Sequence, residues 1–113
     1  MSEDRLRTPD VEALLRAFSE LTTPDEVFAF LQDVATIREL QDMAQRLAVA
    51  RMLAAGVHYA DIQHATGASS TTISRVSRCL NYGADGYQRA LEFLGPLAPA
   101  EDGAKGTTSK AGE

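Results

Sequence analysis

Two Thr-Pro-Asp tripeptides, at residues 8–10 and 23–25, constrain the fold most, because each is followed by apolar residues at helical spacing. A threonine hydroxyl caps the free backbone amides at a helix start, and proline is favoured at the first helical position. The first tripeptide precedes apolar residues at positions i, i+3, i+4 and i+7, namely Val11, Leu14, Leu15 and Phe18. Helices are therefore predicted over residues 9–21 and, with Glu26 completing a capping box on Thr23, over residues 24–33.

A third helix, the longest, is predicted from Thr36 to Ala55. Glu39 follows Thr36 at capping-box spacing, and Gly56 is a typical residue directly after a helix end. The apolar residues of this helix cover more than one face, so it needs partners on several sides. Either a second copy of the chain covers these faces, or their alanines tolerate solvent; the sequence leaves both open.

Two shorter helices flank Gly67, and a sixth is predicted from a cap at Asp85-Gly86 to Gly95-Pro96. Signals for strands, hairpins and repeats are absent, so the predicted fold class is all-α with six helices. Residues 9–95 are expected to form one helical domain, after a flexible N-terminus at residues 1–8. Small and polar residues dominate residues 96–113, which predicts a disordered tail.

Several classes of protein are excluded by composition. No apolar stretch approaches the ~20 residues of a membrane span, and the polar N-terminus lacks the apolar region of a secretory signal, which predicts a cytoplasmic protein without a membrane partner. One cysteine, Cys79, forms no internal disulfide, and with His58 and His64 it provides no metal-ligand set. Neither an enzyme nor a bound cofactor is expected, because no nucleophile with a base and no phosphate-binding loop is present.

The segment from Tyr59 to Leu80 has the pattern of a helix-turn-helix. Its turn must redirect the chain within a few residues, which favours a positive φ that Gly67 adopts without strain. Ser69 or Ser70 then caps the second helix. The apolar contacts between the two helices are predicted to be Ile62, Ala68, Ile73 and Val76.

The second of these helices carries apolar residues on one face, namely Ile73, Val76 and Leu80. Thr71, Arg75 and Arg78 lie about opposite, and such side chains suit a major groove, because arginine binds guanine or phosphate and hydroxyls bind base edges or backbone. Amides at the helix start favour phosphate. The candidate DNA-binding residues are Ser69, Ser70, Thr71, Thr72, Ser74, Arg75 and Arg78.

The formal net charge of −5 argues at first against a nucleic-acid partner. The charge is unevenly distributed, however. Residues 1–45 carry ten acidic and four basic side chains, whereas residues 46–80 carry four arginines against Asp61 alone. The excess of positive charge therefore coincides with the predicted helix-turn-helix.

The chain resembles the Trp-repressor-like proteins of the YerC/YecD group, within the Trp repressor superfamily, over about residues 10–95. The stretch that carries the resemblance runs from Ala65 to Tyr87 and reads ATGASSTTISRVSRCLNYGADGY. The resemblance implies an all-α, intertwined homodimer that regulates transcription, as a repressor, by binding double-stranded DNA. Its two reading helices would enter successive major grooves ~34 Å apart.

The resemblance also implies a candidate effector site. In the tryptophan repressor, the corepressor is held by an arginine of the central helix, an arginine of the recognition helix and a threonine, and the matching residues here are Arg46, Arg75 and Thr36. The family pattern has glycine after the second arginine, where this chain has Val76, whose branched side chain would occupy much of the slot. We expect that tryptophan is not the effector; another small anion, ion pairing and phosphate contact remain open for the two arginines.

Two questions stay open from the sequence. The favoured function is sequence-specific binding of duplex DNA, and the alternative is a helical module that docks on another regulator or on the transcription machinery. Tyr82 and Tyr87, which flank the glycines after the recognition helix, either touch the DNA backbone or pack at a dimer seam.

Overall fold

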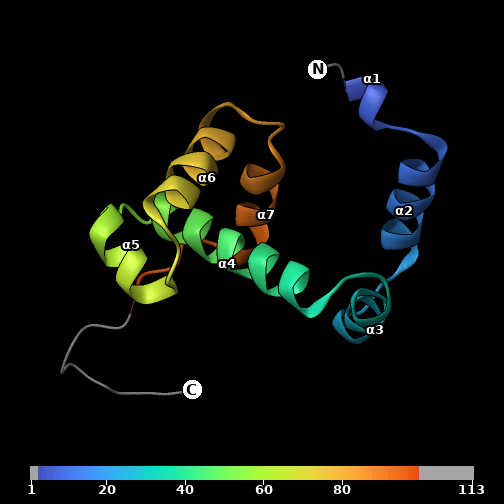
Figure 1. The fold of residues 1–113 in the computed structure, drawn as a ribbon, viewed down its shortest axis with the longest axis horizontal. Coiled ribbons are helices and arrows are strands. Elements are labelled where there is room, and N and C mark those ends of the chain that lie inside the picture. The colour runs from blue at the N-terminus through green and yellow to red at the C-terminus, as the bar shows by residue number, and fades with distance from the viewer. Residues whose placement is uncertain (1–2, 100–113) are drawn as a thin grey trace. The chain divides into compact units, whose positions relative to one another are not determined.

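The computed structural model describes residues 3–99, and every regular element in this range is a helix (Figure 1). The helices are α1 (Glu3–Leu6), α2 (Pro9–Glu20), α3 (Pro24–Val34), α4 (Ile37–Ala54), α5 (Tyr59–Thr66), α6 (Ser70–Tyr82) and α7 (Gly86–Leu94). The predicted all-α class is confirmed, and α2 to α7 are the six predicted helices. The four-residue α1 was not predicted and lies within the segment expected to be flexible. No helix among residues 3–99 is long and apolar enough to cross a membrane.

The chain forms two compact units, Met1–Leu40 and Gln41–Glu113, with the division inside α4. The caps of the first unit are close to those predicted. The hydroxyl of Thr8 accepts a hydrogen bond from the amide of Val11 at 3.2 Å, and that of Thr23 accepts from the amide of Glu26 at 3.1 Å. The Glu26 carboxylate accepts mainly from the amide of Thr22, at 2.9 Å, with a smaller contribution from the predicted partner, the amide of Thr23. Each helix thus has one of its free N-terminal amides capped by a threonine hydroxyl.

The first unit lacks buried side chains among its described residues. The rings of Phe18 (α2) and Phe30 (α3) pack edge to face with centroids 5.3 Å apart, but no residue of either helix is buried. Phe28, Val34 and Ile37 are more than half exposed, at 52%, 53% and 78%. Local hydrogen bonds, rather than a core, define the helices of this unit.

The second unit contains the core. Seven side chains form one buried cluster: Val49, Ala50 and Met52 of α4, Ile62 of α5, Ala68 of the turn, and Ile73 and Val76 of α6. Leu80 is buried as well. The four apolar contacts predicted for the helix-turn-helix are all among these residues. Because full burial of such a side chain stabilises by about 1.5–3 kcal/mol, this cluster fixes α5 and α6 against α4.

The C-terminal end of the domain differs from the prediction. Arg51 (α4) donates hydrogen bonds to the carbonyl oxygens of Leu94 and Gly95, both at 3.0 Å, and its own carbonyl accepts from the amide of Leu97 at 3.1 Å. Leu97, which we assigned to the disordered tail, packs against the core cluster. The helical domain therefore extends to at least residue 97, and residues 100–113 of the predicted tail lie outside the described residues.

The start of α7 also departs from the prediction. Asp85 occupies the cap position, but its side chain forms no capping hydrogen bond. Its backbone is left-handed, with φ of 68°, whereas a capping side chain normally requires an extended backbone. Asp85 thus forms part of the bend between α6 and α7, and its side chain does not cap the free amides of α7.

Candidate nucleic-acid interface

The turn between α5 and α6 is built around Gly67. This residue has φ of 77° and ψ of 2°, which confirms the predicted positive φ, and its amide closes α5 on the carbonyl of Gln63 at 2.8 Å. The hydroxyl of Thr66 donates to the carbonyl of Ile62 at 2.7 Å and accepts from the amide of Ala68 at 3.1 Å. A side chain at Gly67 would be strained, so this position fixes where α6 begins.

A contact with α4 holds the same turn. The side-chain amide of Gln45 donates to the carbonyl of Thr66 at 3.0 Å. This bond joins residues far apart in the sequence, and sequence reasoning missed it. The turn is therefore tied to the central helix through a polar bond as well as through the apolar core.

Ser69, not Ser70, caps α6. Its hydroxyl accepts from the amide of Thr72 at 3.1 Å and lies 3.1 Å from the hydroxyl of Thr72. These two predicted DNA-binding residues thus satisfy each other. Ser70 is the first helical residue and is exposed.

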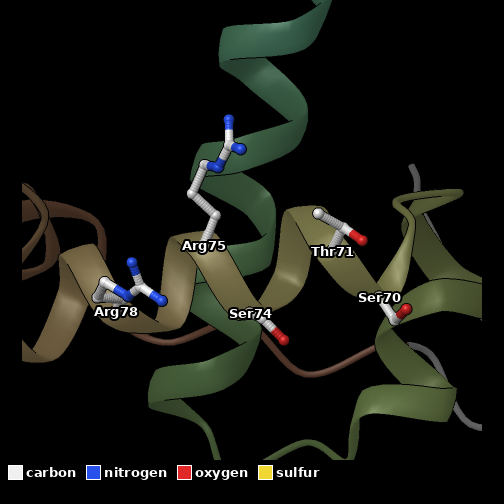
Figure 2. Close-up of a pocket in the computed structure, with 5 residues that line it drawn as sticks. All are labelled: Ser70, Thr71, Ser74, Arg75 and Arg78. Atoms are coloured by element: carbon white, nitrogen blue, oxygen red, sulfur yellow. The ribbon is translucent and has the colours of Figure 1, made fainter.

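The outward face of α6 brings five of the seven predicted DNA-binding residues together. They line a shallow concavity on the helix surface, as Figure 2 shows: Ser70, Thr71, Ser74, Arg75 and Arg78. All five are exposed, while Ile73 and Val76 on the opposite face are buried at 0% and 1% exposure. The sequence-based division of α6 into an apolar and a polar face is therefore observed in the structure.

The outward face of α6 carries the positive charges of Arg75 and Arg78. Within residues 3–99, neither Arg75 nor Arg78 forms an ion pair, in contrast to Arg7, Arg16 and Arg89. The first turn of α6 contains no acidic residue, so the positive end of the helix dipole is also unopposed. Both features favour an anionic partner.

The other two arginines between residues 46 and 80 have different surroundings. Arg51 holds the end of α7, as described above, and Arg46 interacts with the hydroxyl of Tyr87. Burial raises the pKa of Tyr87 above 10.0, and the positive charge of Arg46 partly opposes this shift. Of the four arginines between residues 46 and 80, therefore, only Arg75 and Arg78 lie on the outward face of α6.

The three candidate effector residues each have their own surroundings. Thr36 caps α4 in the first unit, where it exchanges hydrogen bonds of 2.8 and 3.0 Å with Glu39. Arg46 interacts with Tyr87, and Arg75 lines the concavity of α6. The effector site stays a prediction. No group of three or more potential metal-ligating side chains occurs in the described part of the chain.

Comparison with known proteins places this architecture in a family. The family model for the Trp repressor protein matches residues 9–94, which include all six predicted helices. The chain belongs to the Trp repressor family. This is a family of regulatory DNA-binding proteins, not of enzymes.

Relatives and solved structures agree with this assignment. The uncharacterized protein YerC of Bacillus subtilis (strain 168) is 48% identical over 92 residues, which cover 81% of this chain and 88% of YerC. A TrpR like protein from Eubacterium eligens superimposes with a TM-score of 0.79 at 48% identity, covering 85% of this chain and 99% of that one. A putative Trp repressor from Staphylococcus aureus gives a TM-score of 0.78 at 37% identity, with coverage of 87% and 98%. The Trp-repressor-like fold of this family member is therefore established.

Proposed function

We propose that this protein regulates transcription in the cytoplasm by binding double-stranded DNA in a sequence-specific manner, with α6 in the major groove. The observation that carries the proposal is the outward face of α6, a helix that packs on the core. Three hydroxyls and two guanidinium groups are exposed on this face, and neither guanidinium forms an ion pair among residues 3–99. An α-helix about 10–12 Å across fits a major groove about 12 Å wide. The membership of a DNA-binding family supports the same function.

The proposed readers differ in role. Ser70, Thr71 and Ser74 lie in the first turns of α6, the part of a recognition helix that meets base edges. Arg75 and Arg78 provide donors for guanine or for phosphate. Ser69 and Thr72 bond each other, so they contribute by fixing the helix start, whose amides favour a phosphate.

The active form is proposed to be a homodimer. The first unit exposes large apolar side chains and buries none among its described residues, which a second copy of the chain would cover. Two copies related by a two-fold axis present two reading helices, so the expected site is a near-palindrome with half-sites ~34 Å apart. Repression, rather than activation, is the regulatory outcome that the family name suggests.

We further propose that tryptophan is not the effector. Val76 is 1% exposed and belongs to the core cluster, so its side chain fills space on the buried face of α6 that a glycine would leave open. Isothermal titration calorimetry with tryptophan is expected to show no stoichiometric binding. Micromolar affinity at one molecule per chain would contradict this expectation.

The test of the function is a selection from a random duplex pool, followed by binding measurements on the selected site. Wild-type protein is expected to enrich a palindrome. Arg75→Ala should weaken binding by about 1–3 kcal/mol if Arg75 contacts a base, or lower the salt slope by about one per reading helix if it contacts phosphate. Arg89→Ala is the matched control, because Arg89 is exposed on α7 and pairs with Glu92.

Two outcomes would contradict the proposal at different levels. An Arg75→Ala variant with wild-type affinity and wild-type salt slope would remove Arg75 from the interface. Failure of the wild-type protein to retain any duplex at low salt would exclude DNA as the partner and favour docking on another protein.

A further inference from the structure

The polar face of α6 continues beyond the residues that line its concavity. Thr71, Arg75, Arg78 and Tyr82 follow one another at positions i, i+4, i+7 and i+11, so they form one stripe along the helix. Tyr82 is 86% exposed, more than any other large apolar or aromatic side chain among the described residues. An exposed phenol thus ends the stripe that begins with the proposed readers.

The end of α6 holds Tyr82 in a defined position. A Cβ atom on Gly83 would lie 2.3 Å from the carbonyl oxygen of Cys79, so only glycine fits directly after Tyr82. The Gly83 amide donates to the same carbonyl at 2.9 Å. Tyr82 is therefore the last residue of α6, and its side chain projects from a regular helical backbone.

Two of the four carbonyl groups that end α6, those of Cys79 and Leu80, accept hydrogen bonds within the protein. The side chain of Gln88 donates to the carbonyl of Leu80 at 2.8 Å, and that of Asn81 donates to the carbonyl of Ser77 at 3.0 Å. Exposed carbonyl groups at a helix C-terminus repel an anion, and the hydrogen bonds to the carbonyls of Cys79 and Leu80 reduce this repulsion. The last turn of α6 has no basic residue, and the exposed Tyr82 hydroxyl is a donor that this end offers to an anion.

Helix geometry sets which part of a duplex Tyr82 can reach. Twelve residues separate Tyr82 from Ser70, a distance of about 18 Å along the helix at ~1.5 Å per residue. The major groove is about 12 Å wide, and the first turn of a recognition helix meets the bases. When Ser70 and Thr71 lie at the base edges, the end of the helix therefore lies beside the sugar-phosphate backbone.

We propose that Tyr82 donates its phenolic hydroxyl to a phosphate oxygen of the bound duplex, and so orients α6 in the groove without reading sequence. This inference rests on the proposed function. It also assigns different roles to the two tyrosines that the sequence left equivalent. Tyr87 is half-buried and interacts with Arg46, whereas Tyr82 is exposed and belongs to the stripe with Thr71, Arg75 and Arg78. Tyrosine is a common donor to DNA phosphates.

The decisive experiment is Tyr82→Phe, which removes the hydroxyl and keeps the ring. Binding to the selected palindrome and to an unrelated duplex is expected to weaken by the same factor, about three- to tenfold, the usual value of one hydrogen bond. The ratio of the two affinities should stay at the wild-type value, and so should the salt slope, because no cation is lost. Tyr87→Phe is the matched control and should bind both duplexes as wild type does.

The outcomes separate this inference from the proposed function. If Arg75→Ala weakens binding and Tyr82→Phe does not, Tyr82 makes no phosphate contact and only this inference fails. A loss confined to the palindrome would show a base contact, and a change in sedimentation of Tyr82→Phe without DNA would place Tyr82 at a dimer seam; either result overturns the inference. If wild-type protein binds no duplex, both proposals fail.

Discussion

The two compact units of the chain form their helices by the same local signals but differ in what covers those helices. In the first unit, Thr8, Thr23 and Thr36 each cap a helix, and none of the described residues is buried. In the second unit, capping by Ser69 is accompanied by a core that includes Ile62 and Ile73 at 0% exposure. Helix formation and core formation are therefore separate properties of this sequence.

This difference indicates what each unit requires for stability. Helices of 11 and 12 residues, such as α3 and α2, are marginal in isolation, because most helical stability comes from packing of the apolar face. The second unit provides that packing within one chain, whereas the apolar faces of the first unit remain exposed. The comparison supports the proposed homodimer, in which the first unit obtains its core from the second copy.

The largest expected effect is a loss of stability when the core of the second unit is truncated. Ile73→Ala should lower the free energy of unfolding by about 2–5 kcal/mol, because a fully buried side chain leaves a cavity between α6 and α4. Urea titration followed by circular dichroism measures this change. Thr71→Ala, at an exposed position of the same helix, is the control and should change stability by no more than about 0.5 kcal/mol. Similar stabilities for the two variants would contradict the core assignment.

An intermediate effect is expected in the first unit, and it should appear as a change in assembly. Ile37 is 78% exposed at the start of α4, and Ile37→Asp replaces an apolar surface by a charge. Aspartate is favourable in the first turn of a helix, so the substitution spares α4 itself. If a second copy covers Ile37, sedimentation should shift from dimer toward monomer, and the melting temperature should become more dependent on protein concentration.

The control for this variant is Gln32→Glu, which adds the same charge at an exposed polar position of α3. It should sediment as the wild-type protein does. A wild-type sedimentation profile for Ile37→Asp as well would remove Ile37 from the dimer interface. A monomeric wild-type protein at all concentrations would contradict the dimer as a whole.

The contrast between local and long-range interactions also explains how much the sequence could predict. The six helices, the left-handed Gly67 and the two faces of α6 follow from residues within a few positions of each other, and all were predicted. Arg51 was counted with the basic charge of the helix-turn-helix region, and Leu97 was placed in the tail, because their contacts join α4 to residues more than 40 positions away. Periodicity and capping patterns carry no information about such pairs.

The candidate site shows the same limit. The sequence predicted which residues of α6 face outward, because helical periodicity alone decides this. It left Ser69 and Ser70 as alternative caps and Tyr82 and Tyr87 as equivalent tyrosines, because their roles depend on the exact helix start and on Arg46 in another helix. The effector residues were suggested by resemblance alone, and they stay a prediction.

The smallest expected effect is a pH dependence of opposite sign in the two units. In the first unit, a hydrogen bond from Arg7 lowers the pKa of Glu12 below 4.5, and a backbone hydrogen bond from Thr22 lowers that of Glu26. A lowered pKa stabilises the folded state at pH values above 4.5, and this contribution is lost as the pH falls through the folded pKa. In the second unit, burial raises the pKa of Tyr87 above 10.0, so its contribution is complete below pH 10 and is lost as the pH rises through the raised pKa.

Acid should therefore loosen the N-terminal caps, and alkali should loosen the contact between α7 and α4. The acid effect should be small, because the two carboxylates are exposed and solvent screens their interactions. Carboxyl carbon shifts followed by NMR report Glu12 and Glu26, and Glu26→Gln should remove one of the two acid transitions. Ultraviolet absorbance of a Tyr59→Phe/Tyr82→Phe variant reports Tyr87 directly. Ionisation of Tyr87 at or below pH 10 would contradict its burial. It would also remove the difference from Tyr82 on which the assignment of Tyr82 alone to a phosphate contact depends.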